Sequence, residues 1–183
     1  MTPRAALLAV AVTLALAACA QTDSFSDRSA EQIVPAAAIP AGTQPGVVEK
    51  VVDGDTIWVR IDEPGGPLVA GATHKVRLLE IDTPEGSGPG GVQCGAREAT
   101  AFAERHLLVG STVHLLADRE DTDRYDRFLR YLWTADGMFF NAEAVRTGHA
   151  RAVLYEPNDA YIELLRAAET EARKARRGIW GDC

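Results

Sequence analysis

The chain has 183 residues and a formal net charge of −7 at pH 7, with 46% hydrophobic and 25% charged residues. This length suits one domain of ordinary size with extra segments, and the composition is typical of a globular protein with a hydrophobic core. The acidic balance excludes a generic basic protein that coats nucleic acid, because such a protein carries a surplus of Lys and Arg.

The first residues have the form of an export signal. One Arg precedes an apolar run that is too short for a membrane span, and small residues then lead to Cys19. Leu16-Ala-Ala-Cys19 also resembles the bacterial lipobox, in which the Cys is lipidated and becomes the new N-terminus. A plain signal with a cleavage site nearby is the alternative. We expect residues 1–18 to be a lipoprotein signal peptide and the exported protein to be lipid-anchored to the bacterial cell membrane, facing outward.

Residues 19–46 are predicted to form a flexible tether. They are rich in Gln, Ser, Asp, Ala and Pro, without sustained periodicity. Such a segment lacks the apolar density that would offset the entropy lost on ordering. A tether directly after a lipidated Cys would let a domain work away from the membrane surface. The folded domain is therefore expected at residues 47–183.

Short strands are expected throughout this domain. Residues 47–62 contain two β-rich runs that are separated at Asp53-Gly-Asp55, and a turn-rich loop follows at residues 63–71. Further strands are expected at residues 74–81, 111–117 and 127–134.

Three helices are expected from apolar residues at helical spacing. They cover residues 94–108, 141–147 and 157–177. Asn141 is placed near the N-cap of the second helix, which Gly148 ends. Strands interleaved with helices indicate an α+β domain and favour a small closed barrel that carries helices.

Two acidic motifs lie at predicted strand ends. Asp53 and Asp55 are two residues apart, so an extended backbone places both carboxylates on one side. In Asp82-Thr-Pro-Glu85, the proline restricts the chain and biases Thr83 toward extended geometry. Hard cations such as calcium bind carboxylate and carbonyl oxygens, so these residues are candidate ligands. Each motif alone is also compatible with a plain turn, because acids, glycine and proline favour turns.

Other charged residues gather near these motifs. Arg77 and Asp82 have opposite parity on a straight strand, which means that their side chains point to opposite faces. They reach one site only if the strand bends or bulges near its end. Glu120–Arg127 holds four acids, two arginines and a tyrosine in eight residues, which also fits a solvated loop. An EF-hand is excluded there, because Tyr125 takes the third ligand position counted from Asp121 and no Gly follows it.

Four motifs occur in one order along the chain. They are Val52-Asp-Gly-Asp-Thr56, Arg77-Leu-Leu-Glu-Ile-Asp-Thr-Pro-Glu85, Asp123-Arg-Tyr-Asp-Arg127 and Asn141-Ala-Glu-Ala-Val-Arg-Thr-Gly148. In this order they resemble the thermonuclease family, the staphylococcal-nuclease-like phosphodiesterases, from roughly Val47 to Trp180. The resemblance implies a five-stranded OB-type β-barrel with three helices. It also implies calcium-dependent hydrolysis of DNA and RNA that leaves 3′-phosphates.

Carried over by motif position, the acids would bind Ca²⁺. Asp55 and Asp82 match the carboxylate ligands, Thr83 would add its backbone carbonyl, and Asp53 would lie in the outer shell. Glu85 occupies the position of the family's proposed general base, which activates water. Without the cation, several acids near an anionic substrate would repel it.

The same resemblance implies substrate roles for arginines and tyrosines. Arg77 and Arg127 match the pair that holds the scissile phosphate, a role that suits the planar, bidentate guanidinium. Tyr125 and Tyr155 match tyrosines near the nucleotide, and Arg124 joins them as a substrate-binding residue. The expected substrate is single-stranded or otherwise flexible DNA or RNA.

Some positions depart from the family pattern or stand outside it. Val153 replaces another nucleotide-side tyrosine and cannot stack or hydrogen-bond as a phenol does, which bears on substrate affinity or base preference. The common Tyr-Gly-Arg is Tyr125-Asp-Arg127, in which Asp tolerates a left-handed turn better than most residues. His114 and His149 have no Cys or His partners at metal-ligand spacing and are interpreted as structural.

Two other functions compete with that of a nuclease. A nuclease-like module at the cell envelope could bind nucleic acid without cleaving it, but such copies typically lose the acids or arginines that this chain retains. A structural envelope protein would explain the lipobox and not the motifs. The favoured hypothesis is a membrane-tethered nuclease that acts as a monomer.

Three cysteines are an odd number for an exported chain. Lipidation of Cys19 would leave Cys94 and Cys183 as a pair, which we predict to form a disulfide in the oxidising compartment that export supplies. The bond would tie the start of the first helix to the C-terminal residue. Two free thiols are the alternative.

Overall fold

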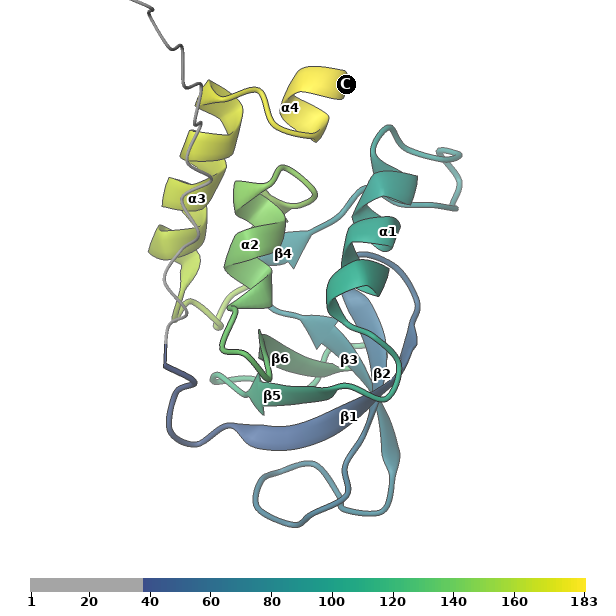
Figure 1. The fold of residues 1–183 in the computed structure, drawn as a ribbon, viewed down its shortest axis with the longest axis vertical. Coiled ribbons are helices and arrows are strands. Elements are labelled where there is room, and N and C mark those ends of the chain that lie inside the picture. The colour runs from purple at the N-terminus through teal and green to yellow at the C-terminus, as the bar shows by residue number, and fades with distance from the viewer. Residues whose placement is uncertain (1–37) are drawn as a thin grey trace, which may run out of the picture. The chain divides into compact units, whose positions relative to one another are not determined.

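A computed structural model describes residues 38–183 of the chain. Five strands in this part close into a barrel in the order β1-β2-β3-β6-β5, and every neighbouring pair is antiparallel except β3 and β6 (Figure 1). The strands are β1 (Gln44–Val51), β2 (Thr56–Arg60), β3 (Thr73–Leu78), β5 (Thr112–Leu116) and β6 (Phe128–Thr134). The predicted signal peptide at residues 1–18, Cys19 and the predicted tether up to residue 37 lie outside the described residues.

Alternating burial along the strands forms the core of the barrel. In β2, Ile57 and Val59 are fully buried, whereas Trp58 between them is 36% exposed. This alternation follows from the two-residue period of an extended chain, whose successive side chains point to opposite faces. The other strands contribute the buried residues Val48, Val76, Leu78, Val113, Leu115 and Leu132.

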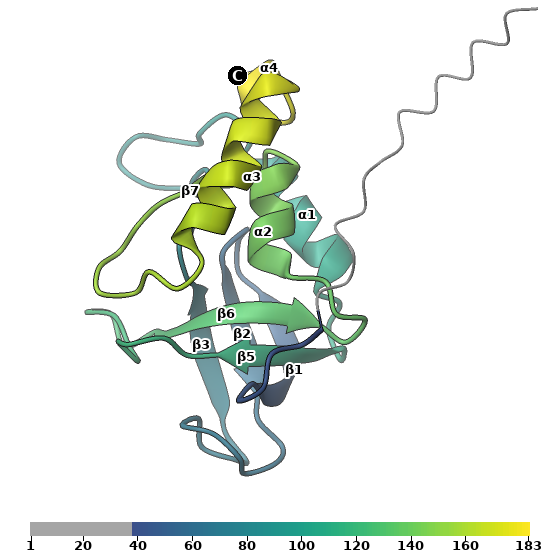
Figure 2. The same cartoon turned by 90° about the vertical axis from the view of Figure 1, so that its left-hand side faces the viewer.

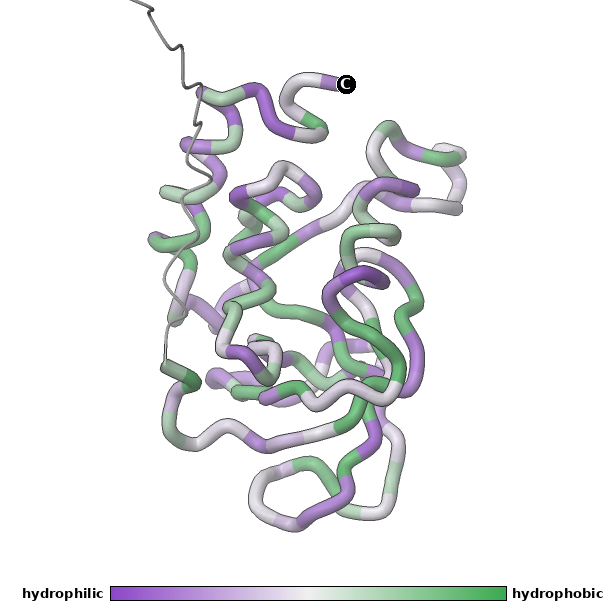
Figure 3. Tube along the Cα trace, viewed as in Figure 1, coloured by the Kyte–Doolittle hydropathy of each residue, from purple (hydrophilic) through white to green (hydrophobic). Residues whose placement is uncertain are grey.

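Three helices lie against one end of the barrel, as Figures 1 and 2 show from two sides. They are α1 (Ala96–His106), α2 (Phe140–Arg146) and α3 (Ile162–Lys174), and the short helix α4 (Ile179–Asp182) follows α3. The helices alternate between hydrophobic and hydrophilic residues in Figure 3, as amphipathic helices do. The five-stranded barrel with three main helices is therefore confirmed. Within residues 38–183, no helix has both the length and the apolar character to cross a membrane.

The third strand ends earlier than predicted. β3 stops at Leu78, and Glu80 takes a left-handed backbone conformation with a φ of 57°. The chain then forms the short strand β4 (Ile81–Asp82), which pairs with β7 (Arg151–Ala152) in a separate two-stranded sheet. Strands of two residues are too short to show a period, so neither of them is predictable from the sequence pattern.

Asn141 lies near the N-cap of the second helix, as predicted, but it does not cap the helix. Phe139 is the N-cap residue, and Asn141 lies inside α2 and is fully buried. Its Oδ1 accepts a hydrogen bond from the N–H of Leu132 at 3.0 Å, and its Nδ2 donates to the carbonyl oxygen of Leu79 at 2.9 Å. The side chain therefore satisfies two buried backbone groups outside the helix, where a cap would satisfy one.

The third helix begins at Ile162, five residues later than predicted. Asn158 is fully buried before it, and its Oδ1 accepts hydrogen bonds from the backbone N–H groups of Arg119 and Glu120 at 3.0 and 2.9 Å. These bonds tie the segment to the loop after β5, a tertiary constraint that helical periodicity does not reveal. Leu164, an apolar residue of this helix, is 49% exposed.

β1 begins at Gln44, three residues before the predicted start of the domain. The buried Gln44 side chain pairs with the backbone of Leu68: its Nε2 donates to the carbonyl oxygen at 2.9 Å, and its Oε1 accepts from the N–H at 3.0 Å. Residues 44–46 thus belong to the barrel and not to a tether.

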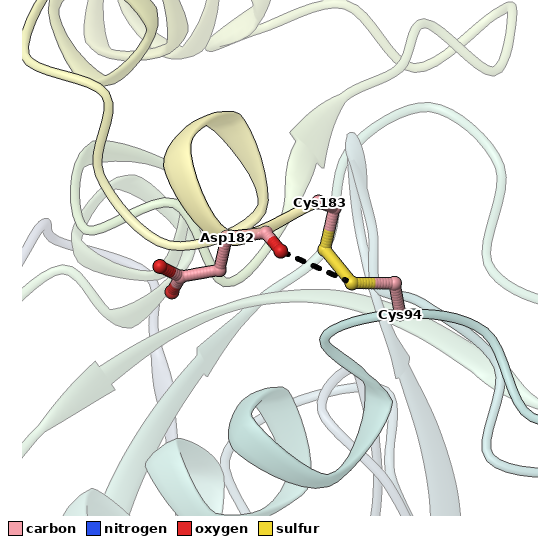
Figure 4. The surroundings of a disulfide bond; sticks show 3 residues. All are labelled: Cys94, Asp182 and Cys183. Carbon is pink, nitrogen blue, oxygen red and sulfur yellow. Dashed lines mark hydrogen bonds between the residues drawn. A yellow bond between two sulfur atoms is a disulfide. The ribbon is translucent and has the colours of Figure 1, made fainter.

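The predicted disulfide between Cys94 and Cys183 is present, with the two Cα atoms 5.9 Å apart (Figure 4). It spans 89 positions in the sequence. The loop-entropy model gives a cross-link of this span at most about 4.6 kcal/mol of stabilisation. The carbonyl oxygen of Asp182 lies 3.8 Å from Cys94 Sγ, which is a contact and not a hydrogen bond, because a disulfide sulfur carries no hydrogen.

Candidate active site

A pocket of about 600 Å³ collects side chains from segments that are far apart in the sequence. It is bordered by the turn before β2, the end of β3 with the turn after it, the loop before β6 and the loop after β7. Nine of the predicted site residues line it: Asp53, Asp55, Arg77, Asp82, Glu85, Arg124, Tyr125, Arg127 and Tyr155. The structure therefore brings these side chains to one place, and Thr83 adjoins them.

Asp55 is almost fully buried, and both of its carboxylate oxygens have partners. Its Oδ2 accepts hydrogen bonds from the backbone N–H and the hydroxyl of Thr83 at 2.9 and 2.8 Å. Its Oδ1 accepts from the hydroxyl of Thr56 at 3.1 Å and lies 3.2 Å from Arg77 Nε. Gly54 permits this approach, because a Cβ at that position would lie 2.7 Å from Thr83 Cγ2. The glycine of the Asp-Gly-Asp motif thus serves a close contact between two segments.

The turn between β3 and β4 holds the buried guanidinium of Arg77. Its Nη1 donates to the carbonyl oxygens of Leu78 and Ile81, both at 2.7 Å. Its Nη2 lies 3.3 Å from Asp82 Oδ1. The left-handed conformation of Glu80 makes the bend that a straight strand lacks, so Arg77 and Asp82 meet despite their opposite parity.

Asp123 holds Arg127 from within the same loop. Nε and Nη2 of Arg127 both lie 2.7 Å from Asp123 Oδ2. Asp123 Oδ1 accepts hydrogen bonds from the backbone N–H groups of Tyr125 and Arg127 at 2.9 and 3.0 Å. Burial alone would raise the pKa of Asp123, but these bonds from Arg127 and Tyr125 hold it below its ordinary value. Asp126 takes a left-handed conformation with a φ of 60°, as the Tyr-Asp-Arg sequence predicts.

Two tyrosines expose their rings at the pocket. Tyr125 is 63% exposed, with the guanidinium carbons of Arg124 and Arg127 at 4.8 and 5.5 Å from its ring centroid. Tyr155 is 46% exposed, and the guanidinium carbon of Arg77 lies 5.9 Å from its centroid. Exposed aromatic rings beside fixed cations are the surfaces on which unpaired bases stack.

Burial and neighbouring charges act on the acids of the pocket. Burial raises the pKa of Asp53, Asp82 and Glu85 above the ordinary values. The negative charge of Asp55 also raises the pKa of all three. The charge of Arg77 opposes these shifts: for Asp82 it outweighs the effect of Asp55, and for Glu85 it offsets that effect only in part. A cation among these carboxylates would lower all three pKa values.

Residues 75–182 match the family model described as staphylococcal nuclease homologue. The chain belongs to this family. It is 40% identical over 135 residues to the thermonuclease of Staphylococcus intermedius, covering 73% of this chain and 74% of that protein. The thermonuclease of Staphylococcus hyicus is 37% identical over 143 residues, which cover 78% and 79% of the two chains. Endonuclease YncB of Bacillus subtilis (strain 168) is 32% identical over 135 residues, covering 73% of this chain and 60% of that protein.

The oxygen donors of this staphylococcal nuclease homologue suit a hard cation such as Ca²⁺. Asp55 and Asp82 both face the pocket, and Thr83 follows Asp82 directly. In the part of the chain that the structure describes, no three His, Cys, Asp or Glu side chains are arranged to hold a metal by themselves. A cation held by two carboxylates would therefore need carbonyl and water oxygens as well, which calcium accepts in a flexible coordination shell. The donor set fits this ion.

Three supporting residues received no role from the sequence. Thr56 lies between Asp55 and Arg127: its hydroxyl donates a hydrogen bond to Asp55 and lies 3.5 Å from Arg127 Nη1. Asp123 lies four residues before its partner Arg127. This spacing of opposite charges could have indicated the ion pair from the sequence. Gln93 accepts a hydrogen bond from the N–H of Glu85 at 3.0 Å across a loop, and no local pattern marks it.

A further acid, Glu80, lies fully buried beneath the turn that carries Arg77 and Asp82. Its Oε2 accepts a hydrogen bond from the N–H of Tyr161 at 3.2 Å, and its Oε1 has no hydrogen-bond partner. Burial raises the pKa of Glu80 to about 7, although hydrogen bonds from Tyr131 and Tyr161 oppose the shift. The neutral carboxylic acid is therefore the form that the fold favours.

The free energy of unfolding is expected to fall as the pH rises from about 4.5 to about 7. Folded Glu80 binds its proton more tightly than unfolded Glu80, so its stabilisation is complete below the unfolded pKa and lost above the folded one. The shift corresponds to roughly 3 kcal/mol. Glu80→Gln should flatten the slope in urea unfolding with chelator present, whereas Glu104→Gln on the exposed face of α1 should not. Equal slopes for wild type and Glu80→Gln would contradict this assignment.

Proposed function

We propose that this protein is a Ca²⁺-dependent nuclease that hydrolyses the phosphodiester bonds of DNA and RNA and leaves 3′-phosphates. The observation that carries the proposal is the convergence of two anchored arginines with an acidic cluster in one pocket. Relatives named as thermonucleases and as an endonuclease support the same reaction class.

Arg77 and Arg127 are assigned to the scissile phosphate. Arg77 is anchored by two backbone carbonyls and Arg127 by Asp123, so both cations keep their places when an anion binds. Negative charge grows on the equatorial oxygens of a phosphodiester as water attacks. Fixed guanidiniums stabilise that charge without the cost of reorganisation, and their planar fork suits two oxygens at once.

Glu85 is assigned to the attacking water. The side chain is exposed and lines the pocket. Partial desolvation of the carboxylate by the surrounding pocket and the charges of Asp55, Asp53 and Asp82 raise its pKa, which makes it a better proton acceptor. A water between Glu85 and the phosphate would lose its proton to this carboxylate as it attacks.

The cation would be held by Asp55, Asp82 and the backbone carbonyl of Thr83, with Asp53 beyond them. When bound, it supplies positive charge that offsets the acids and the phosphate. The chain's own contacts orient the ligands: Thr83 fixes one oxygen of Asp55, and Arg77 lies against Asp82.

The substrate proposed is single-stranded or flexible DNA or RNA. Tyr125 and Tyr155 offer exposed rings to unpaired bases, and Arg124 adds charge beside Tyr125. Val153, in the position where the family pattern has a tyrosine, offers no such ring, so we expect base stacking to depend on the other two residues.

Export, a lipid anchor at Cys19 after removal of residues 1–18, an outward-facing position at the bacterial membrane and a monomeric state complete the proposal. These four statements rest on the sequence alone. The N-terminal motif supports the first three, and the tether would give the domain reach from the membrane.

A cleavage assay with analysis of product ends tests the proposed reaction. The full chain is incubated in calcium with a 5′-labelled single-stranded DNA and, separately, with an RNA. We expect shortened products whose 3′ ends are sensitive to phosphatase. Bound but intact oligonucleotides would instead support the alternative, a nucleic-acid-binding module without catalysis.

A further inference from the structure

Glu85 stands at the base of a loop that has little packing of its own. All residues from Glu85 to Cys94 are exposed. Gly86, Gly88, Gly90 and Gly91 make up four of the six positions after Glu85. A glycine-rich exposed segment is conformationally free, so the position of Glu85 depends on whatever closes the loop at its base.

Reciprocal hydrogen bonds between Glu85 and Gln93 close this loop. The N–H of Glu85 donates to Gln93 Oε1 at 3.0 Å, and the N–H of Gln93 donates to the carbonyl oxygen of Glu85 at 2.9 Å. We call this pair the Gln93 clasp. Its bonds are exposed to solvent, so the clasp alone gives weak restraint.

The residues on either side of the clasp rest on α4. Cys94, next to Gln93, is bonded to Cys183 directly after α4 (Figure 4). A Cβ at Gly95 would lie 2.5 Å from Ile179 Cγ2 and 3.5 Å from Pro84 Cγ. The missing side chain thus leaves room for Ile179 of α4 beside Pro84, the residue before Glu85.

α4 is in turn fixed to the body of the domain. The N–H of Ile179 donates to the carbonyl oxygen of Gly148, just after α2, at 3.0 Å, and the Ile179 side chain is buried. Gly178 and Gly148 approach so closely that a Cβ on either would clash with the backbone of the other segment. A continuous path of contacts therefore runs from α2 through α4 to both ends of the loop that carries Glu85.

From this path we infer that α4 and the Cys94–Cys183 disulfide are a positioning element for Glu85, acting through the Gln93 clasp. The inference rests on the proposed function, because it takes Glu85 as the water-activating residue. An element that only stabilised the fold would affect activity equally whatever residue stood at position 85. That difference can be measured.

The decisive experiment is a double-mutant cycle between the disulfide and Glu85. Cys94→Ser/Cys183→Ser is made in the wild-type chain and in Glu85→Gln, and steady-state cleavage is measured below the melting temperature of each variant. We expect the serine pair to lower kcat about 10- to 100-fold in the wild type, because a misplacement of about 1 Å is that costly. In the Glu85→Gln background we expect the serine pair to lower kcat less than about threefold. KM should change little in both backgrounds.

Gln93→Ala tests the clasp with the disulfide intact, and Val92→Ala, at a neighbouring side chain that is 62% exposed, is the matched control. Gln93→Ala should lower kcat only when Glu85 is present, and Val92→Ala should not change it. Hydrogen exchange gives a readout besides activity: the amide of Glu85 should exchange faster in the serine pair and in Gln93→Ala, and at the wild-type rate in Val92→Ala.

Equal losses of kcat in the two backgrounds, or an unchanged exchange rate for the Glu85 amide in the serine pair, would overturn the inference. A wild-type chain that cleaves no polynucleotide would defeat the proposed function instead. The exchange rates would still decide whether α4 and the disulfide restrain the loop.

Discussion

Arg127→Lys is expected to lower turnover about 10²- to 10³-fold, the usual cost of losing one fixed donor to a charged transition state. Lysine keeps the positive charge but loses the planar fork. In the wild type Nε and Nη2 hold Asp123, so a further edge of the guanidinium remains for the phosphate. A single ammonium cannot bond Asp123 and a phosphate with that geometry. Single-turnover cleavage of a single-stranded DNA measures the loss.

Arg166→Lys on α3 is the matched control, because its exposed guanidinium pairs only with Glu163 among the described residues. It should cleave at the wild-type rate, and all variants should keep the wild-type melting temperature within a few degrees. Arg77→Lys should lose turnover as Arg127→Lys does. If both site variants cleaved at near-normal rates, the assignment of these arginines to the phosphate would be wrong.

Removal of calcium is expected to abolish cleavage. Asp53, Asp82 and Glu85 have pKa values raised by burial and by the charge of Asp55, so without a cation a phosphate would meet uncompensated negative charge. Chelator should reduce the rate to background, and added calcium should restore it. Magnesium should support cleavage poorly, because it retains its waters and demands stricter octahedral geometry.

The control for this experiment is the same chelator presaturated with calcium, which should leave the rate unchanged. Asp55→Asn should need more calcium for half-maximal cleavage, since it removes one of the two proposed carboxylate ligands. A full rate in metal-free chelator would remove the cation from the proposed mechanism.

The barrel and helices were predictable because their signals are local. Ile57 and Val59 alternate with an exposed Trp58, and Ala99, Phe102 and Ala103 recur at helical spacing on the buried side of α1. Each pattern needs only neighbours in the sequence. The strands β4 and β7 and the buried role of Asn141 depend on partners far along the chain, which no window of sequence contains.

The candidate site divides in the same way. Its acids and arginines could be selected because they stand in compact motifs whose order resembles a known family. The convergence of these residues in one pocket could not be predicted. The contact between Arg77 and Asp82 depends on the left-handed backbone conformation of Glu80, which is uncommon for a residue other than glycine. Gln93 was missed for a related reason: its bond to Glu85 crosses an exposed loop whose closure follows from α4 and the disulfide.

The most direct test of the central claim follows binding and cleavage of one labelled single-stranded DNA in the same calcium-containing samples. The wild-type chain and the Arg77→Lys/Arg127→Lys double variant are compared at matched concentrations. The proposed nuclease site predicts rapid shortening of the DNA by the wild type, with at most a trace from the double variant. DNA that stays intact with the wild type while it is bound, or that both proteins shorten at the same rate, would contradict the claim that this pocket cleaves phosphodiester bonds.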